Sequence, residues 1–286
     1  MTDAHHPESE QLSGYVVFIA SIAAIGGFLF GFDSGVINGT VGAIQQAFDS
    51  SSVGTGFSVA SMLLGCAVGA LFAGGFADKY GRKPSMILAA TGFLISAIGS
   101  GAAGSTGVFI AARVLGGISV GAASVLAPAY IAEVSPAKYR GRLASLQQLA
   151  IVVGLFSAFM SNYLIAKFSG GAREEWVLGF TAWKWMFRVE CIPALVFGIG
   201  ASLSPESPRY LVAQSRDDEA RKVLTIIRIP DVEGKIRDIH ESLQSTTKPR
   251  FSDVLQPGTL RLRPIVWLGI GLSVFQQFVG INVIFY

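Results

Sequence analysis

The sequence predicts an all-α membrane protein. Of its 286 residues, 51% are hydrophobic and only 14% are charged, whereas about a quarter of the residues of a soluble domain carry a charge. The mean hydropathy is +0.53, and uncharged stretches recur that are long enough for a helix to cross about 30 Å of hydrocarbon. The net charge of +3 is too small to indicate a nucleic-acid partner. Two cysteines inside apolar stretches, Cys66 and Cys191, do not make a disulfide framework.

Seven apolar segments are long enough to span a bilayer. They cover residues 15–38, 57–77, 85–103, 108–131, 143–166, 185–203 and 264–286. The polar start of the chain contains no Lys or Arg, so it does not resemble a cleavable signal, and the first span is expected to be retained. We therefore divide the chain into a tail, a six-span domain, a linker and a seventh span, at residues 1–14, 15–204, 205–263 and 264–286.

The positive charges between the spans predict the orientation. The links after spans 2 and 4 are rich in Lys and Arg, whereas the links after spans 1 and 3 contain neither; the basic residues are Lys79, Arg82, Lys83, Lys138, Arg140 and Arg142. Because basic loops stay on the cytoplasmic side, we expect a cytoplasmic N-terminus. The expected location is the plasma membrane, or the inner membrane in a bacterium, with the lipid bilayer as a partner.

The linker at 205–263 differs in composition from the rest of the chain. It carries eleven Lys and Arg and nine Asp and Glu, and it falls on the predicted cytoplasmic side. Two sets of apolar residues follow helical spacing; they are Ala220, Val223, Leu224 and Ile227, and then Val232, Ile236, Ile239 and Leu243. This spacing predicts two or three short amphipathic helices.

Asp33 and Arg113 are the clearest charged residues inside the spans. Charged side chains are costly in lipid, so they face a cavity or a partner. Span 1 runs outward and span 4 inward, so each residue lies about 8 Å from the outer end of its span, Asp33 before Asn38 and Arg113 after Val108. A guanidinium favours the ionised carboxylate, so a movement that separates the two could load or release a proton. A static ion pair between two helices is the alternative.

The turn after span 2 carries a spaced motif of glycines and charges. Its residues are Gly74, Asp78, Lys79, Gly81, Arg82 and Lys83. The pattern resembles the loop signature of the major facilitator superfamily. The resemblance implies the N-terminal six-helix half of a major facilitator fold, followed by a cytoplasmic helical insert and helix 7.

Two further stretches are similar to the sugar porter family of that superfamily. One combines Glu133 with Arg140-Gly141-Arg142, and the other reads Pro-Glu-Ser-Pro-Arg-Tyr-Leu over residues 205–211. The resemblance implies a cytoplasmic network that latches the two halves of the transporter. Glu190, near the start of span 6, also matches a family position. The candidate gating residues are Asp78, Arg82, Glu133, Arg140, Glu190, Glu206 and Arg209.

Amide side chains within the spans are candidates for sugar binding, because amides donate and accept hydrogen bonds as sugar hydroxyls do. They are Gln147 and Gln148 in span 5, and Gln276, Gln277 and Asn282 in span 7. Interhelical hydrogen bonding is the alternative for an isolated Gln. Gln148 matches the family's helix 5 sugar contact, and Gln276, Gln277 and Asn282 resemble its helix 7 motif. Two turns beyond Gln148, many relatives have another Gln, whereas this chain has Leu155.

The resemblance implies secondary active transport of a monosaccharide by alternating access. Asp33 lies where proton-coupled members of the family carry an acid, which favours proton symport with Arg113 as its partner. The family's last five spans are absent, so the chain is expected to be truncated after helix 7 and to need the missing C-terminal half to complete the site. No cofactor is expected.

Other functions remain as alternatives. A facilitative sugar uniporter or a non-transporting sugar sensor would keep the same fold and sugar-binding amides. A seven-span receptor is disfavoured because span 7 contains no Lys for a retinal Schiff base. A membrane-embedded enzyme is disfavoured because the histidines, His5, His6 and His240, lie outside the spans and no metal-ligand or nucleophile pattern occurs within them.

Overall fold

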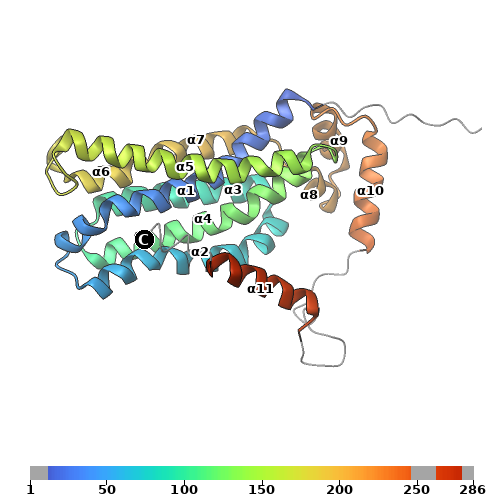
Figure 1. Ribbon diagram of the computed structural model, residues 1–286. Helices are drawn as coiled ribbons and strands as arrows, with labels where there is room; N and C mark the ends of the chain where they lie inside the picture. The colour runs from blue at the N-terminus through green and yellow to red at the C-terminus, as the bar shows by residue number, and fades with distance from the viewer. Residues whose placement is uncertain (1–11, 246–261, 279–286) are drawn as a thin grey trace, which may run out of the picture. The chain divides into compact units, whose positions relative to one another are not determined.

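The structure is a computed structural model that describes residues 12–245 and 262–278. Six of the described segments are long and apolar enough to cross a membrane, and their helices alternate in direction along the bundle (Figure 1). They are α1 (Gly14–Ala47), α2 (Ser52–Tyr80), α3 (Arg82–Ala102), α4 (Thr106–Val134), α5 (Arg140–Ser169), and a sixth span made of α6 (Ala182–Val189) and α7 (Cys191–Leu203).

Shorter helices follow and connect these spans. They are a 3₁₀ turn, η1 (Val177–Gly179), and the helices α8 (Pro208–Ala213), α9 (Asp217–Ile226), α10 (Val232–Ser245) and α11 (Pro264–Phe278). The chain divides into two compact units, and the boundary between them along the sequence falls between Ile236 and Arg237. The second unit contains α11, which covers the first part of the predicted seventh span.

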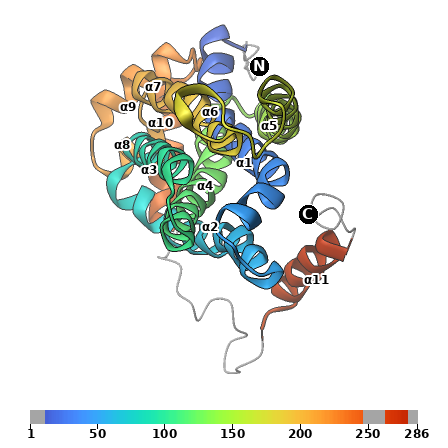
Figure 2. The same ribbon diagram turned by 90° about the vertical axis from the view of Figure 1, so that its left-hand side faces the viewer.

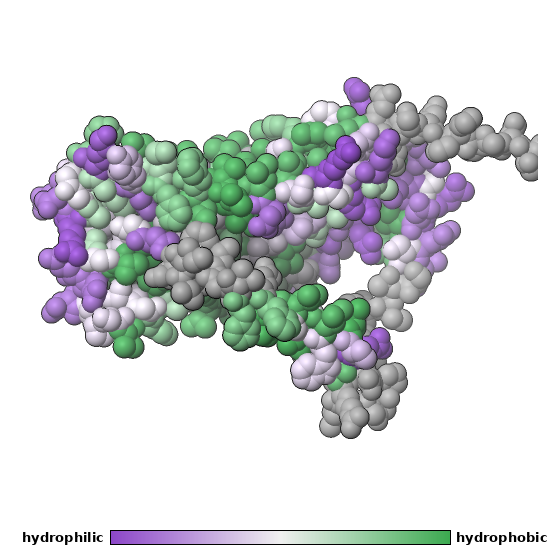
Figure 3. Space-filling model, in the orientation of Figure 1, coloured by the Kyte–Doolittle hydropathy of each residue, from purple (hydrophilic) through white to green (hydrophobic). Residues whose placement is uncertain are grey.

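Within the first unit, the spans form a bundle in which α4 packs between α2 and α3, and α1 packs against α5 and α4. Figure 2 shows the same helices viewed along the axis of the bundle. We call the end with the α2–α3 turn and the α4–α5 link the basic end, and the other the opposite end. Exposed apolar side chains cover the middle of the bundle, and polar residues gather at its two ends (Figure 3).

Glycines allow the closest helix contacts. A Cβ atom on Gly65 or Gly69 of α2 would collide with backbone carbonyl oxygens of α4, and one on Gly117 or Gly121 of α4 would collide with those of α2. Gly31 of α1 and Gly154 of α5 are related in the same way. Lipid gives no hydrophobic drive for helices to associate, so close backbone packing supplies the contact energy instead.

The first span is longer than the sequence suggested. Its helix continues nine residues past Asn38 to Ala47, so Asp33 lies about 21 Å from the helix end and not about 8 Å. The hydroxyl of Thr40 donates to the carbonyls of Val36 and Ile37, and Ala43 and Ile44 are buried. The polar residues after Asn38 are therefore accommodated within the helix. The sixth span also begins earlier, at Ala182, and its two helices meet at Glu190.

The helices after the sixth span follow the predicted pattern. The four residues of the first predicted apolar set are buried, with Ala220, Val223 and Leu224 in α9 and Ile227 directly after it, which confirms an amphipathic helix here. Before its first turn, Arg216 donates two hydrogen bonds to Glu219, at 2.8 and 2.6 Å. This bonding lowers the pKa of the exposed Glu219 carboxyl.

Candidate functional site

A buried ion pair joins α1 to α4. The Nη1 atom of Arg113 donates to Oδ1 of Asp33, and Nη2 donates to Oδ2 at 2.8 Å. Both side chains are only 1% exposed. The structure thus confirms that these two residues meet inside the bundle, although α1 extends further than the depth count assumed. Two parallel hydrogen bonds fix the guanidinium and the carboxylate in one plane.

Two further neighbours of Arg113 lie in α2 and α6. The Nη2 atom of Arg113 donates a hydrogen bond to the sulfur of Met62 in α2 at 3.0 Å. The guanidinium also lies 5.4 Å from the ring centre of Phe187 in α6, within the range of cation–π attraction. Three helices besides α1 therefore converge on this pair.

Glu190 belongs to the same buried cluster. It lies at the junction of α6 and α7 and is 1% exposed. Its carboxyl group interacts electrostatically with both Asp33 and Arg113. Glu190 was predicted from the sequence as a gating residue, and in the structure it lies beside the ion pair. The cluster therefore contains two carboxyl groups and one guanidinium.

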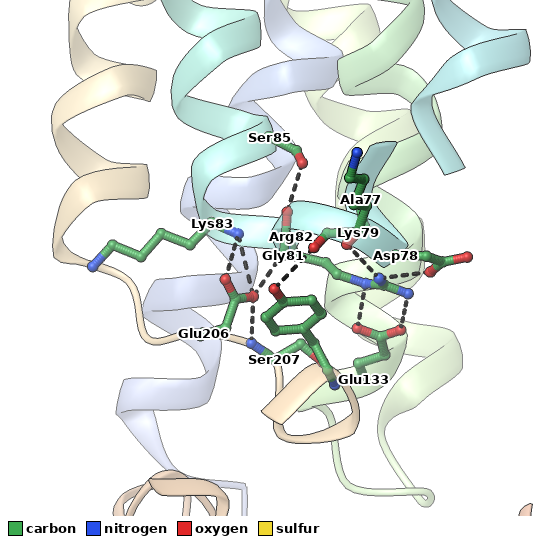
Figure 4. A network of polar contacts seen from close by, with 11 residues as sticks. Ala77, Asp78, Lys79, Gly81, Arg82, Lys83, Ser85, Glu133, Glu206 and Ser207 are labelled. Carbon is green, nitrogen blue, oxygen red and sulfur yellow. Dashed lines mark hydrogen bonds and ion pairs between the residues drawn. The ribbon is translucent and has the colours of Figure 1, made fainter. Parts of the chain in front are cut away.

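A second polar network lies at the basic end, around Arg82 (Figure 4). The guanidinium donates to both carboxylate oxygens of Glu133 in α4, at 3.1 and 3.0 Å. It also donates to Asp78 at 2.8 Å and to the carbonyl oxygen of Ala77 at 2.9 Å. The Glu133 side chain is 13% exposed, whereas that of Asp78 is 71% exposed. Arg82 therefore joins the end of α2 to α4.

Glu206 caps the start of α3 (Figure 4). Its Oε1 accepts hydrogen bonds from the backbone amides of Arg82 at 2.8 Å, Lys83 at 3.3 Å and Ser207 at 2.8 Å. The residue before α3, Gly81, has φ +100° and no side chain to cap the helix, and a Cβ atom there would collide with the Glu206 carboxylate. A carboxylate at a helix N-terminus also interacts favourably with the helix dipole.

The remaining predicted gating residues are not part of this network. Within residues 12–245 and 262–278, neither Arg140 nor Arg209 forms an ion pair. Arg140 is exposed at the start of α5, and Arg209 is half-buried in α8. The structure thus brings four of the seven predicted gating residues together and leaves Glu190, Arg140 and Arg209 outside; the four are Asp78, Arg82, Glu133 and Glu206.

The predicted sugar-binding amides fall into two groups. In α5, Gln148 is exposed, whereas Gln147 donates to the carbonyl oxygen of Ser124 in α4 at 3.3 Å. Gln147 thus makes an interhelical hydrogen bond, which was the alternative to a role in sugar binding. Gln276 and Gln277 lie on α11, but their side chains are outside the described part of the structure, as is the whole of Asn282.

Two polar contacts between distant segments were not predicted from the sequence. The amide nitrogen of Asn162 in α5 donates to the carbonyls of Gly35 and Val36 in α1. The hydroxyl of Tyr130 donates to the carbonyl of Pro205 at 2.7 Å. An Asn within an apolar span was the available signal for the first, since a buried amide in lipid needs partners. Among the described residues, no group of three or more His, Cys, Asp or Glu could hold a metal ion.

Six helices long and apolar enough to cross a membrane, with an ion pair buried among them, define a multi-pass membrane protein. The chain belongs to the sugar transporter family, since residues 19–286 match the family described as "Sugar (and other) transporter". This is a family of transporters, and the chain is not an enzyme.

Individual relatives agree. The chain is 56% identical over 273 residues to the "Glucose transport protein" of Synechocystis sp., covering 95% of this chain and 58% of that protein. It is 36% identical over 301 residues to the "D-xylose-proton symporter" of Escherichia coli K12, covering 96% of this chain and 60% of that protein. The chain therefore spans less than two thirds of the length of these curated relatives.

Solved structures show the same fold. The major facilitator superfamily proton:xylose symporter XylE bound to 6-bromo-6-deoxy-D-glucose superimposes with a TM-score of 0.83 at 36% identity, covering 96% of this chain and 62% of that one. A partially occluded inward open conformation of XylE from E. coli gives 0.82 at 35% identity, covering 96% and 66%. The fold is the N-terminal six-helix part of the major facilitator fold, with the helical linker and α11 after it.

Proposed function

We propose that the complete protein is a sugar:proton symporter that carries a monosaccharide across the membrane by alternating access. The single observation that carries this proposal is the buried cluster of Asp33, Arg113 and Glu190. Intramembrane ionisable groups are expensive to bury and typically mark ion and proton pathways. Membership of the sugar transporter family and the similarity to a named proton symporter support the same conclusion.

The charges of the cluster suggest how a proton would couple to movement. If both carboxyl groups were ionised, one negative charge would lack a partner, and burying such a charge is costly. The cluster is therefore expected to hold one proton on its two carboxyl groups. If the proton binds Asp33, it competes with Arg113 for the carboxylate and weakens the bond between α1 and α4. Rocking of one half of the transporter against the other around a central site could then follow.

For the sugar, we propose contacts from Gln148 in α5 and from Gln276, Gln277 and Asn282. Amides match sugar hydroxyls because both donate and accept hydrogen bonds. An aldose is the expected class, because the named relatives transport glucose and xylose. The chain covers only part of the length of those relatives. The rest of the sugar site would come from the C-terminal half of the major facilitator fold.

The basic end would be the cytoplasmic gate. The proposal rests on the positive-inside rule and on the network that ties Arg82 to Asp78 and Glu133, with Glu206 on the start of α3. Opening toward the cytoplasm would require these bonds to loosen. Arg140 and Arg209 would take part only after a rearrangement or with residues outside the described part.

The test is sugar accumulation by the complete protein in proteoliposomes with an inward proton gradient, using labelled D-glucose and D-xylose. We expect Asp33→Asn to lose accumulation at least about tenfold, because Asn cannot exchange a proton, yet to retain sugar exchange at equal concentrations. The control is Asp49→Asn, since Asp49 is an exposed carboxylate in the link after α1. It should leave accumulation unchanged.

Three results would argue against the proposal. Accumulation by Asp33→Asn equal to that of the wild type would exclude Asp33 as the coupling residue. Equilibration without accumulation in the wild type would indicate a facilitative uniporter. Sugar binding without flux would indicate a sensor.

A further inference from the structure

Asn162 makes an unusual contact between α5 and α1. Its side chain is buried, with the residue 6% exposed. Its Nδ2 atom donates to the carbonyl oxygens of Gly35 at 3.0 Å and of Val36 at 3.2 Å. These carbonyls belong to the second and third residues after Asp33 in α1. The amide therefore bonds directly to the helix backbone beside the buried carboxylate.

The α1 helix is rich in glycine in this region. Glycine is among the weakest helix formers, and α1 has glycines on both sides of Asp33; those within seven residues of it are Gly26, Gly27, Gly31, Gly35 and Gly39. A Cβ atom on Gly39 would lie 2.5 Å from Nδ2 and 2.8 Å from Cγ of Asn162. Gly39 thus leaves the space that the amide occupies, and the two residues fit each other across the helix interface.

We propose that Asn162 is a positioning residue for Asp33, which holds the α1 backbone so that the carboxylate meets Arg113 in the paired geometry. This inference rests on the proposed function, in which Asp33 exchanges the coupled proton. Asn162 does not contact the carboxylate itself. It acts through the carbonyls of Gly35 and Val36.

The surroundings of Asp33 make this role measurable. The ionisable groups that face it are Arg113 from α4, Glu190 from the α6–α7 junction and Cys66 from α2. From α5 the contact comes through the Asn162 amide, which does not titrate near neutral pH. Replacing it changes no charge, so any shift in the pH dependence of transport reports a change in the geometry of the pair.

The experiment measures proton-driven sugar uptake by the complete protein as a function of pH for Asn162→Ala, Gly39→Ala and the double variant. We expect Asn162→Ala to move the pH of half-maximal uptake upward by about half a unit, because a proton competes more easily with a less well-placed Arg113. Gly39→Ala should move it in the same direction by displacing the amide. The double variant should shift the curve by less than the sum of the two single shifts, since both changes remove the same contact.

Ser157→Ala is the matched control on α5, because Ser157 is half-buried and its hydroxyl donates to the carbonyl oxygen of Val153 within its own helix. It should leave the pH curve unchanged. If Asn162→Ala is not recovered as folded protein, Gly39→Ala gives the same readout with the amide still present.

Asp33→Asn, measured in parallel, separates the two proposals. If Asp33→Asn loses accumulation while Asn162→Ala and Gly39→Ala keep the wild-type pH curve, the positioning role is wrong and the symport proposal stands. Additive shifts in the double variant would also contradict the positioning role. If Asp33→Asn still accumulates sugar, the proposed function fails and this inference fails with it.

Discussion

At the scale of single residues, Arg82 has two carboxylate partners that differ sharply in exposure. The Glu133 side chain is 13% exposed and takes two hydrogen bonds, whereas that of Asp78 is 71% exposed and takes one. We expect Glu133→Gln to destabilise the protein by about 1–3 kcal/mol, since it leaves Arg82 partly unpaired, and Asp78→Asn by at most about 1 kcal/mol. Thermal unfolding of the detergent-solubilised protein measures both. Equal losses would show that burial does not decide the strength of these pairs.

The residues of the two polar networks show which contacts could be predicted from the sequence and which could not. The pairing of Asp33 with Arg113 was predictable, because a charge in lipid needs a partner and few are available. The bonding of Glu206 to the amides of Arg82 and Lys83 was not. It depends on the turn at Gly81, which leaves the start of α3 without a side-chain cap. The place of Glu190 beside the ion pair depends on how α6 and α7 pack, which no local pattern encodes.

At the scale of helices, glycine spacing determines which pairs approach closely. A Cβ atom on Gly117 of α4 would collide with the carbonyl oxygen of Met62 in α2, whereas one on Gly107, also in α4, would meet nothing within 4 Å. We therefore expect Gly117→Ala to destabilise the protein by about 1–3 kcal/mol through overpacking. Gly107→Ala should be neutral or slightly stabilising. Thermal unfolding in the same detergent distinguishes them, and a tolerated Gly117→Ala would show that α2 and α4 can separate without cost.

The helices themselves were largely predictable, because long apolar segments can be read directly from the sequence. Their ends were less so. The extension of α1 to Ala47 depends on Thr40 bonding to carbonyls of its own helix and on burial of Ile44. The break at Glu190 has a local signal, because Pro193 has no backbone N–H to donate to the carbonyl of Val189, four residues earlier. The extension of α1, by contrast, results from tertiary packing, which competes with local preference.

At the scale of the whole molecule, the apolar middle and polar ends of the six-helix bundle fit a bilayer, but its orientation remains a prediction (Figure 3). The basic end carries Lys79, Lys83, Lys138, Arg140 and Arg142. Because positively charged links stay in the cytoplasm, the α4–α5 link should be cytoplasmic. The α5–α6 link should then face the other side of the membrane.

Single cysteines placed in these two links test the orientation. Cys66 and Cys191 are first replaced by Ala, and Ala137→Cys and Glu174→Cys are then made separately, since both positions are exposed. We expect a membrane-impermeant maleimide to label position 174 in right-side-out vesicles, and position 137 only in inside-out vesicles or after permeabilisation. The reverse pattern would place the Arg82 network on the outer side and would contradict its role as a cytoplasmic gate. The buried Asp33–Arg113 pair would be unaffected by either result, because its contacts do not depend on the direction of insertion.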